Sequence, residues 1–257
     1  WKKRSEGLLV MMFHEIWTFR PVLNKDYLVQ QLHRHGIARV LRVADAVFTS
    51  TNDQAAHLMK LEPKCTVEVL PVGSNIPAPT SRNESREVRS AVVFGLESSR
   101  LRDVRAMKDD LHALATSEVI DKLITCGRII SANEQSLLAA LPLRNGFVQT
   151  GQLSPNDISD KLGSVRFAIS GQDPLSVQKS GTFMAYAAHG LNIISPHADH
   201  LAAEPICWLV HPRELLAGIG DMELRSRAES LRAWQQRTAS WPQIAARFAD
   251  ALQLQAA

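Results

Sequence analysis

Residues 165–195 read VRFAISGQDPLSVQKSGTFMAYAAHGLNIIS, and the order of apolar and polar runs in this stretch decides the fold. An apolar run over 165–170 leads into a polar turn, an apolar segment of helical length that stops at Gly190, and a second apolar run over 191–195. Strands that are apolar on both faces and alternate with single helices are typical of parallel sheets covered on both sides. The stretch therefore predicts a strand, a helix and a second, parallel strand.

The same alternation runs through most of the 257 residues. Apolar runs predict nine strands, at Leu8–Phe13, Ala46–Thr49, Val67–Leu70, Ala91–Phe94, Leu123–Cys126, Phe147–Thr150, Val165–Ser170, Leu191–Ser195 and Ile206–Val210. Helical spacing predicts helices over 26–44, where Leu28 and Leu32 share a face with Leu41, and over 101–114. We expect an α/β protein with two Rossmann-like, doubly wound domains, of which the first is incomplete.

Local signals mark several helix ends. Thr51 and Gln54 form a capping box, and Ser154 followed by Pro155 is a typical helix start. Gly163 is expected to close the helix that begins at Ser154.

A polar, proline-rich stretch over 77–90 interrupts the alternation and predicts an interdomain linker at 81–90. The first domain then covers 1–80 and holds only three strands, the second covers 91–238 with six, and 239–257 is a final helix with a return to the first domain as one option. Three strands bury too little apolar area for an independent domain. The missing initiator Met suggests a fragment or a processed product. The shortage of strands suggests a first domain that is incomplete at its N-terminus or that leans on something absent from this chain.

Composition excludes some classes of protein. No run of about 18 apolar residues is present, so no membrane-spanning helix is expected. The net charge of +3 does not predict nucleic-acid binding, but residues 1–50 contain eight Lys and Arg against four Asp and Glu. This basic region is either a solvated surface or a surface that faces anionic lipid or a polyanionic acceptor. Three widely spaced cysteines, Cys65, Cys126 and Cys207, indicate thiols in a reducing, cytoplasmic compartment.

Several catalytic motifs are absent from the sequence. It has no Gly-Lys dipeptide of a Walker loop, no GxGxxG after a strand, no GxSxG, and no pair of aspartates two residues apart. His197 and His200 stand three apart, but Pro196 predicts a loop there, so we expect no metal site. No resident cofactor is expected either.

Glycine-led turns follow four predicted strands of the second domain, and ligands bind beyond the carboxyl ends of such strands. These turns begin at Gly95, Gly127, Gly151 and Gly171. Glycine is common in such turns whether or not a ligand binds, so any one of them carries little weight.

The segment Lys179–Thr182 carries more weight. A helix begins there, and its free N–H groups and partial positive charge favour phosphate. Ser180 and Thr182 add hydroxyl groups, Gly181 permits close approach of the backbone, and Lys179 adds a full charge. A cap alone requires one serine, so this segment predicts a phosphate site.

Further stretches complete a resemblance that covers nearly the whole chain. They are FHE (13–15), ADAVFTSTNDQAAHL (44–58), VLPVGSNIP (69–77), VVFG (92–95), VQTGQLSPNDISDKLGSVRFAIS (148–170) and KSGTFMAYAAHGLNIIS (179–195). Their order resembles that of GT-B glycosyltransferases, in particular the large retaining family of bacterial nucleotide-sugar transferases. The resemblance implies a C-terminal domain that binds the nucleotide diphosphate, an N-terminal domain that binds the acceptor, and transfer in the cleft between them.

The resemblance implies a role for each matching position. The diphosphate would contact Ser180, Gly181, Thr182 and Gly95, the nucleoside would lie against Thr150, Gly151, Gln152 and Leu153, and His14 and Glu15 would face the transferred sugar, with Ser74 and Asn75 near the cleft. Lys179 with Arg100 or Arg102 is expected to supply positive charge to the departing diphosphate, and Gly127 lies at a neighbouring strand end. His14 either orients hydroxyl groups or acts as a base.

The sequence departs from that family at one functional position. Many members carry two glutamates eight residues apart, of which the second holds the ribose, whereas Val177 and Ala185 stand here. Either Asp173 or Ser176 then contacts the ribose, or affinity for the donor has been lost.

Three functions remain. The first is a glycosyltransferase acting on a glycan or lipid-linked acceptor, with peripheral association at the inner face of the plasma membrane. The second is a GT-B-like sugar-nucleotide epimerase, and the third is a non-catalytic nucleotide-sugar-binding or partner subunit.

Overall fold

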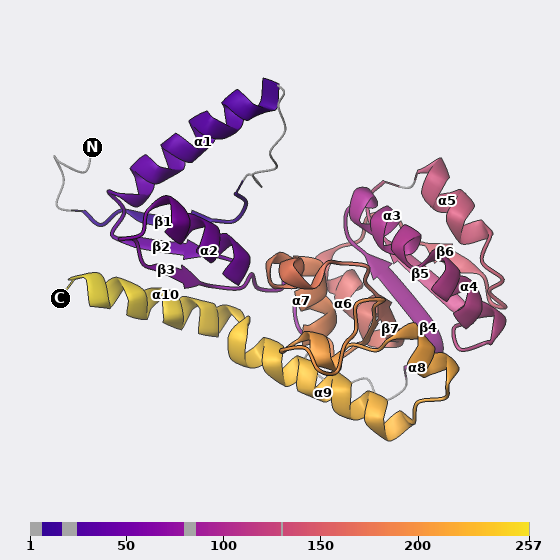
Figure 1. Cartoon of the computed structure of the whole chain (residues 1–257). Helices are drawn as coiled ribbons and strands as arrows, with labels where there is room; N and C mark the ends of the chain where they lie inside the picture. Colours follow the sequence, from indigo (N-terminus) through magenta and orange to yellow (C-terminus); the bar gives the residue numbers. More distant parts are fainter. Residues whose placement is uncertain (1–6, 17–24, 80–85, 130, 257) are drawn as a thin grey trace. The chain divides into compact units, whose positions relative to one another are not determined.

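The computed structural model describes residues 7–16, 25–79, 86–129 and 131–256 of the chain (Figure 1). The chain divides into two compact units. The first contains Trp1–Val72 and Trp241–Ala257, and the second contains Gly73–Ser240.

The first unit has a parallel three-stranded sheet in the order β1-β2-β3. Its elements are β1 (Val10–Phe13), α1 (Lys25–Leu41), β2 (Ala46–Thr49), α2 (Asn52–Leu61), β3 (Val67–Val69) and α10 (Trp241–Ala256). The central strand β2 is buried along its whole length. On one face its Phe48 ring stacks on Phe248 of α10, with centroids 4.8 Å apart.

The start of α2 agrees only in part with the predicted capping box. Thr51 is the N-cap, and its side chain accepts a hydrogen bond from the backbone N–H of Gln54. The Gln54 side chain turns instead to the sheet, where its oxygen accepts from Thr49 Oγ1 at 2.7 Å and its nitrogen donates to the carbonyl of His14 at 3.1 Å. Gln54 therefore fixes the carboxyl ends of β1 and β2.

Helix α1 does not bury the whole apolar face that its spacing predicts. Leu41, at its end, is 3% exposed, whereas Leu28 and Leu32 are 70% and 72% exposed. The helical period of the apolar residues thus identified the helix correctly. A three-stranded sheet, however, offers too little surface to cover the first half of α1.

The second unit has a parallel five-stranded sheet in the order β6-β5-β4-β7-β8 (Figure 1). Its strands are β4 (Glu87–Phe94), β5 (Lys122–Cys126), β6 (Phe147–Gln149), β7 (Val165–Ile169) and β8 (Asn192–Ile194). Its helices are α3 (Glu97–Ala106), α4 (Lys108–Thr116), α5 (Ala132–Ala139), α6 (Pro155–Ser164), α7 (Gly181–Ala188), α8 (Pro212–Leu216) and α9 (Asp221–Thr238), with 3-10 turns at Pro174–Lys179 and Ile206–Trp208.

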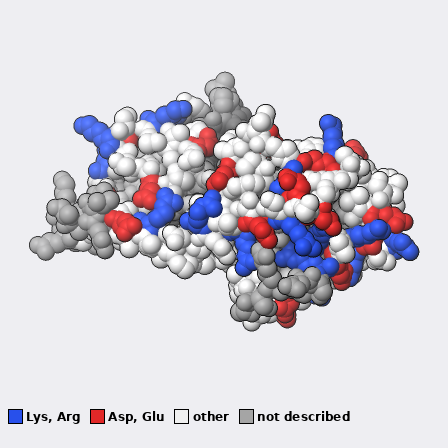
Figure 2. Space-filling model, turned by 90° about the horizontal axis from the view of Figure 1, so that it is seen from below, with Lys and Arg blue, Asp and Glu red and all other residues white. Residues whose placement is uncertain are grey.

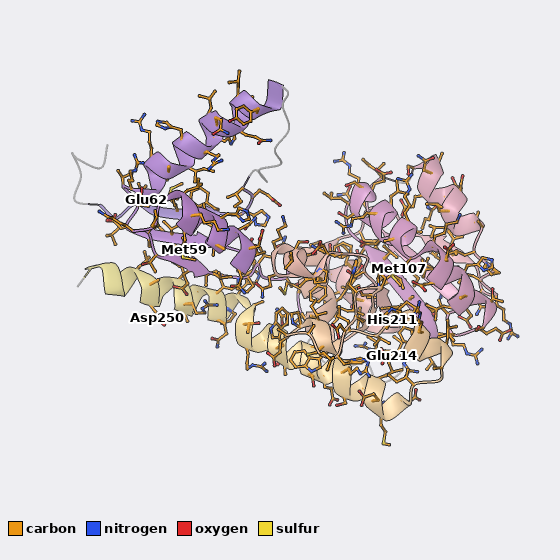
Figure 3. All side chains as sticks on the ribbon, in the orientation of Figure 1. Met59, Glu62, Met107, His211, Glu214 and Asp250 are labelled. Carbon is orange, nitrogen blue, oxygen red and sulfur yellow. The ribbon has the colours of Figure 1, made fainter. Side chains whose placement is uncertain are left out.

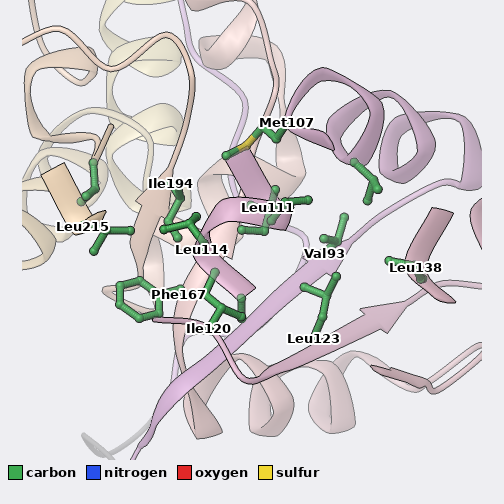
Figure 4. Packing of buried hydrophobic residues seen from close by; sticks show 14 of the residues in the cluster. Val93, Met107, Leu111, Leu114, Ile120, Leu123, Leu138, Phe167, Ile194 and Leu215 are labelled. Carbon is green, nitrogen blue, oxygen red and sulfur yellow. The ribbon is translucent and has the colours of Figure 1, made fainter. Parts of the chain in front are cut away.

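A continuous apolar core lies between this sheet and helices α3, α4, α5 and α8. Figure 4 shows its centre, where Val93 and Phe167 from neighbouring strands meet Leu111 and Leu114 of α4, and these side chains are at most 3% exposed. Burial of several such side chains, each stabilising by about 1.5–3 kcal/mol, makes this unit far better packed than the first.

Four details differ from the sequence-based expectations. Residues 87–90, assigned to the linker, begin β4, Arg86 precedes that strand, and residues 81–85 of the predicted linker lie outside the described residues. The ninth strand is wrong: Ile206–Trp208 forms a 3-10 turn, and Val210 makes one isolated bridge to Ile194. The helix predicted over 101–114 is broken at Met107, whose fully buried side chain is labelled in Figure 3. Helix α6 continues through Gly163.

The caps of the second unit agree better with the sequence. Ser154 caps α6 with Pro155 in the first turn, and Gly190 follows α7 with a φ of +62°. Helix α8 carries a full capping box between His211 and Glu214, both labelled in Figure 3. Among the described helices, none is long and apolar enough to cross a membrane.

Candidate functional site

The candidate site lies at the carboxyl edge of the five-stranded sheet, where β4 ends in Gly95 and α7 begins. Gly95 has a φ of +131°, and a Cβ built there would lie 3.1 Å from Oγ1 of Thr182. The glycine is needed both for this backbone conformation and for the close approach of the two segments. The structure therefore brings Gly95 together with the start of α7.

The first turn of α7 is capped from within. Ser180 is the N-cap, and its Oγ accepts a hydrogen bond of 3.2 Å from the N–H of Phe183. Gly181 has room around it: a Cβ there would meet Asn75 Nδ2 at 3.7 Å and no atom closer. Lys179 precedes the cap, is half-buried and is engaged in an interaction of its own. The helix end therefore combines free N–H groups, a hydroxyl group and an ammonium group.

Tyr186 holds α7 against β4. Its hydroxyl accepts a hydrogen bond of 2.6 Å from the N–H of Phe94, the residue just before Gly95. The side chain is buried, and desolvation raises the pKa of its hydroxyl well above the usual value. The group is therefore neutral and can serve as a fixed hydrogen-bond partner that sets the distance between the strand end and the helix.

Arg100 does not face a ligand, although the sequence suggests that it supplies charge to a diphosphate. Its side chain and that of Glu134 are both fully buried and form a bidentate ion pair, with Nε–Oε1 and Nη2–Oε2 distances of 2.7 Å. Nη1 also donates to the carbonyl of Gly95 at 2.6 Å, and Nη2 donates to the carbonyl of Ile129. Arg100 is thus a positioning residue that holds the turn after β4.

The turns after β5 and β6 are attached to the same frame. A Cβ built on Gly127 would lie 1.8 Å from Arg100 Nη1 and 2.4 Å from the carbonyl oxygen of Gly95, so only glycine fits there. The N–H of Gly127 donates to the carbonyl of Gly151 at 3.0 Å, and the N–H of Gly95 donates to the carbonyl of Cys126. Three of the four predicted glycine turns are therefore joined by hydrogen bonds.

Arg102 and the fourth turn meet at Asp103. The Asp103 carboxylate accepts hydrogen bonds from Nε and Nη2 of Arg102, at 3.0 and 2.9 Å, and from the backbone of Gly171. Burial raises the pKa of the Asp103 carboxyl group. Arg102 and the backbone of Gly171 lower this pKa by less, so that it stays above its ordinary value. Gly171 is close-packed, because a Cβ there would lie 2.7 Å from the Cβ of Ala106.

The loop that is expected to face the nucleoside follows β6. Gln152 is exposed, Gly151 and Leu153 are half-buried, and Gly151 has a φ of +69°. Just before this loop, Nε2 of Gln149 is buried and has no hydrogen-bond partner among the described residues. Sequence reasoning missed Gln149, because one Gln at a strand end carries no distinctive signal.

The remaining candidates occupy two separate places. Asp173 caps the 3-10 turn before α7, where its carboxylate accepts from the N–H of Leu175 at 2.8 Å and its carbonyl accepts from Ser176 Oγ. His14 and Glu15 follow β1 in the first unit, and both are exposed. The grouping described above therefore comes entirely from the second unit.

His197 and His200 lie in a loop, as their spacing next to Pro196 predicts. His200 is held by Glu214 at 2.7 Å and by the carbonyl of Cys207 at 3.2 Å. Within the described part of the chain, no group of three His, Cys, Asp or Glu side chains could hold a metal ion.

No family model and no curated protein matches the sequence. Solved structures do match. WaaG, a glycosyltransferase involved in lipopolysaccharide biosynthesis, aligns with a TM-score of 0.59 at 16% identity over 90% of this chain and 71% of its own. The sucrose-phosphate synthase of Thermosynechococcus elongatus aligns with a TM-score of 0.62 at 12% identity, over 98% and 69%. The fold is that of GT-B glycosyltransferases.

A third GT-B structure is a mutant of S. aureus TarM in complex with fondaparinux, alpha-GlcNAc-glycerol and UDP. It aligns with a TM-score of 0.62 at 8% identity over 95% of this chain and 50% of its own. The GT-B chain described here thus spans about half the length of TarM. At these identities the comparison establishes architecture, and activity requires a separate argument from the site.

Proposed function

We propose that the protein is a glycosyltransferase that transfers a sugar from a nucleotide-diphosphate sugar to a glycan or lipid-linked acceptor. The observation that supports this most is the contact between the Gly95 turn and Thr182 at the start of α7. The two segments offer backbone N–H groups and a hydroxyl group at one point of the carboxyl edge, where doubly wound sheets bind their ligands.

Each part of the donor would meet a different group. The diphosphate would accept hydrogen bonds from the first turn of α7, and the positive charge of Lys179 would lie beside it. Together these groups would stabilise the leaving group in place of a metal ion. The nucleoside would lie along Gly151–Leu153, where the unpartnered Nε2 of Gln149 can donate to a base or a ribose oxygen. Asp173 and Ser176 remain the proposed ribose contacts.

Arg100 has a different role in this proposal from Arg102. Arg100 would act through the carbonyl of Gly95 and give shape to the turn, because its own donors are already bonded. Arg102 is half-exposed, and its charge is partly offset by Asp103. We propose Arg102 as a contributor to the electrostatic field at the diphosphate, with Lys179 as the main cation.

The acceptor side is proposed to lie in the first unit. His14, at the exposed end of β1, would orient hydroxyl groups or remove the acceptor proton, with Glu15 beside it. Replacement of His14 by Gln would then lower transfer more than UDP binding. Equal activity of His14→Gln and the parent would remove His14 from the proposal.

Helix α1 supports a proposal of peripheral binding at the inner face of the plasma membrane. Leu28 and Leu32 are exposed one turn apart, and Arg34 and Arg39 on the same helix are also exposed. An exposed apolar pair with nearby basic groups suits an anionic lipid surface. Co-sedimentation with phosphatidylglycerol vesicles should fall in the Leu28→Ser, Leu32→Ser double variant, whereas unchanged co-sedimentation would contradict this.

Incubation with labelled UDP- and GDP-sugars, with product analysis, tests the main proposal. Transfer or donor hydrolysis is expected, and replacement of Lys179 by Ala should lower its rate at least about tenfold. The matched control is Lys161→Ala, an exposed lysine on α6. An unchanged rate in Lys179→Ala would exclude Lys179 from the mechanism, and isomerised donor would indicate an epimerase instead.

One observation favours a non-catalytic nucleotide-sugar-binding subunit as the second candidate. Val177 and Ala185 occupy the places of the two family glutamates and are buried, at 2% and 0% exposed. Their neighbourhood therefore offers the sugar and ribose no carboxylate at these positions. Saturable UDP binding without transfer or hydrolysis would support this candidate over the first.

A further inference from the structure

Positive charge alone does not mark a ligand contact on this protein. On the face shown in Figure 2, Lys and Arg side chains have Asp and Glu side chains among them. The carboxyl edge of the five-stranded sheet is similar, because Arg100 is paired there with Glu134 and Arg102 with Asp103. The position of an uncharged donor that the protein leaves unengaged is therefore more informative at this edge.

Asn75 carries such a donor, and it lies beside the start of α7. A Cβ built on Gly181, the first residue of α7, would be 3.7 Å from Asn75 Nδ2 and 3.9 Å from the carbonyl oxygen of Gly73. Asn75 is exposed, and its side chain makes no hydrogen bond within the described part of the chain. Asn75 and Gly181 both belong to the second unit. The amide group is thus close to the helix start and open to solvent.

A short turn holds the backbone of Asn75 in this place. Oγ of Ser74 donates to the carbonyl of Ile76 at 2.7 Å and accepts from the N–H of Ile76 at 3.1 Å. Ile76 is only 7% exposed, so the residue that follows Asn75 is anchored in the protein. A segment that is fixed before a ligand arrives loses little conformational entropy when the ligand binds. The turn therefore presents the Asn75 amide to the start of α7 in advance.

The space over Gly181 can hold a ligand oxygen. No protein atom outside the neighbouring residues lies closer than 3.7 Å to the position that a Cβ would take there. An oxygen atom at that position would be 3.7 Å from Asn75 Nδ2, and a small movement of the amide would bring it within hydrogen-bond distance. The amide nitrogen has two N–H groups to donate, which suits a phosphate oxygen.

The contacts between the turns give the order of the groups along the carboxyl edge. The N–H of Gly127 donates to the carbonyl of Gly151, in the proposed nucleoside loop, and Gly127 packs closely against the carbonyl of Gly95. Gly95 in turn lies close to Thr182 of α7. Asn75 is beside the start of α7, at the far end of this series from the nucleoside loop. A donor whose nucleoside lies along that loop therefore brings its second phosphate toward Asn75.

We propose that Asn75 is a specificity-determining residue, which donates a hydrogen bond to the phosphate next to the transferred sugar. Asn75 then distinguishes nucleoside diphosphates from nucleoside monophosphates, because only a diphosphate extends from the nucleoside loop to the start of α7. This role rests on the donor site proposed above and adds to it a residue from the segment that precedes β4. It concerns recognition of the donor and includes no step of the chemistry.

Calorimetric titration of the full chain tests this role, with UDP and GDP as probes and UMP and GMP for comparison. Asn75→Ala removes the amide and should weaken diphosphate binding about tenfold, as expected for a hydrogen bond to a charged group, while monophosphate binding stays the same. Asn75→Asp keeps the size of the side chain but brings a negative charge toward the phosphate, so it should weaken diphosphate binding further. The matched control is Asn145→Ala, at an exposed asparagine before β6, which should bind as the parent does.

A variant of Gly181 separates this role from the donor site on which it rests. Gly181→Ala puts a Cβ into the space over the helix start without a close contact, so the circular dichroism spectrum should be unchanged and diphosphate binding should weaken. Weak binding in Gly181→Ala with parent-like binding in both Asn75 variants would overturn the role of Asn75 and leave the donor site in place. An equal loss of monophosphate and diphosphate binding in Asn75→Ala would also overturn it. A parent chain that binds neither UDP nor GDP at about 10 mM would overturn the role and the donor site together.

Discussion

Arginine side chains have different surroundings at the two edges of the five-stranded sheet. At the carboxyl edge, Arg100 is fully buried, and its guanidinium is bonded to Glu134 and to two backbone carbonyls. At the amino edge, Arg232 of α9 lines a cavity of about 1180 Å³ beside the starts of β4, β7 and β8. Its side chain is partly exposed, and its buried Nε has no partner among the described residues.

The difference separates two uses of a charged side chain. A guanidinium that is bonded to a buried carboxylate and to backbone carbonyls gives shape to the turns, whereas one on the lining of a cavity keeps part of its side chain toward solvent. The sequence does not distinguish these two kinds of arginine, because both Arg100 and Arg232 lie on helices that pack against the same sheet. Only their surroundings in the folded protein distinguish them. The following predictions test how firmly the carboxyl edge is fixed.

The largest effect is expected from breaking the buried ion pair. Replacement of Glu134 by Ala leaves the charge of Arg100 buried without its partner and should lower the free energy of unfolding by about 3–5 kcal/mol. Urea unfolding measures this. The double variant Arg100→Met, Glu134→Leu removes both charges and should lose less.

The matched control for that pair is Arg89→Ala. It breaks the pair of Arg89 and Glu118, both about half-exposed, and should cost less than about 1 kcal/mol. If Glu134→Ala unfolds at the same urea concentration as Arg89→Ala, the buried ion pair of Arg100 and Glu134 stabilises the protein no more than an exposed pair, and Arg100 is not needed to hold the carboxyl edge.

The next effect concerns the close contact of the turns. Replacement of Gly127 by Ala puts a Cβ against Arg100 Nη1 and the carbonyl of Gly95, and relief of this overlap should cost about 1–3 kcal/mol of stability. UDP binding should weaken as well, because the Gly95 turn must move. Gly146→Ala is the comparison variant, since its Cβ meets nothing within 4 Å and it is strained only by its φ of +67°.

A smaller effect is expected where α7 meets β4. The Tyr186→Phe variant leaves the N–H of Phe94 without its hydrogen-bond partner and should lower the free energy of unfolding by about 1–3 kcal/mol. Tyr27→Phe, which removes a hydroxyl group from an exposed tyrosine, should change little. Equal stability of Tyr186→Phe and the parent would show that water replaces the tyrosine.

The smallest effect is a pH dependence at the amino edge. Burial, with Arg86 and Arg232 nearby, lowers the pKa of His189 below its ordinary 6.5 despite the bond to Ala185. The unfolded chain then binds more protons than the folded one, so stability is full above pH 6.5 and falls as the pH drops below it.

The slope from one proton cannot exceed about 1.4 kcal/mol per pH unit. Unfolding of His189→Gln between pH 7 and pH 5 should show a weaker dependence on pH than the parent, and His197→Gln, which alters an exposed histidine, should match the parent. An identical slope for the parent and His189→Gln would contradict the assigned direction of the pKa shift.

Local signals predicted the parts of the fold that depend on neighbouring residues. Eight of the nine expected strands coincide with strands of the structure, because apolar runs of four to six residues can be buried only inside such a sheet. The caps at Thr51, Ser154 and Ser180 are also present, since a cap involves residues only two or three apart. The ninth strand is wrong, because Ile206–Trp208 is an apolar run that forms a 3-10 turn in which Ile206 is buried, so the apolar pattern alone does not require a strand.

The candidate site was predictable only in outline. Glycine turns and the polar start of α7 were visible in the sequence, because backbone access and helix ends have local signatures. The buried state of Arg100 was not, since its partner Glu134 lies 34 residues away and resembles any first-turn glutamate. The exposure of Leu28 and Leu32 was also hidden, because helical period says nothing about the size of the sheet beneath.

The order of apolar runs and the local caps thus determined by themselves that this chain forms parallel sheets covered by helices. Tertiary structure alone decided which polar side chains are hydrogen-bonded inside the protein and which are not. The physical reason is that a hydrogen bond or an ion pair depends on distance in space. Arg100 with Glu134, Tyr186 with Phe94, and Asn192 without a partner in the described chain become distinct only after the strands are ordered.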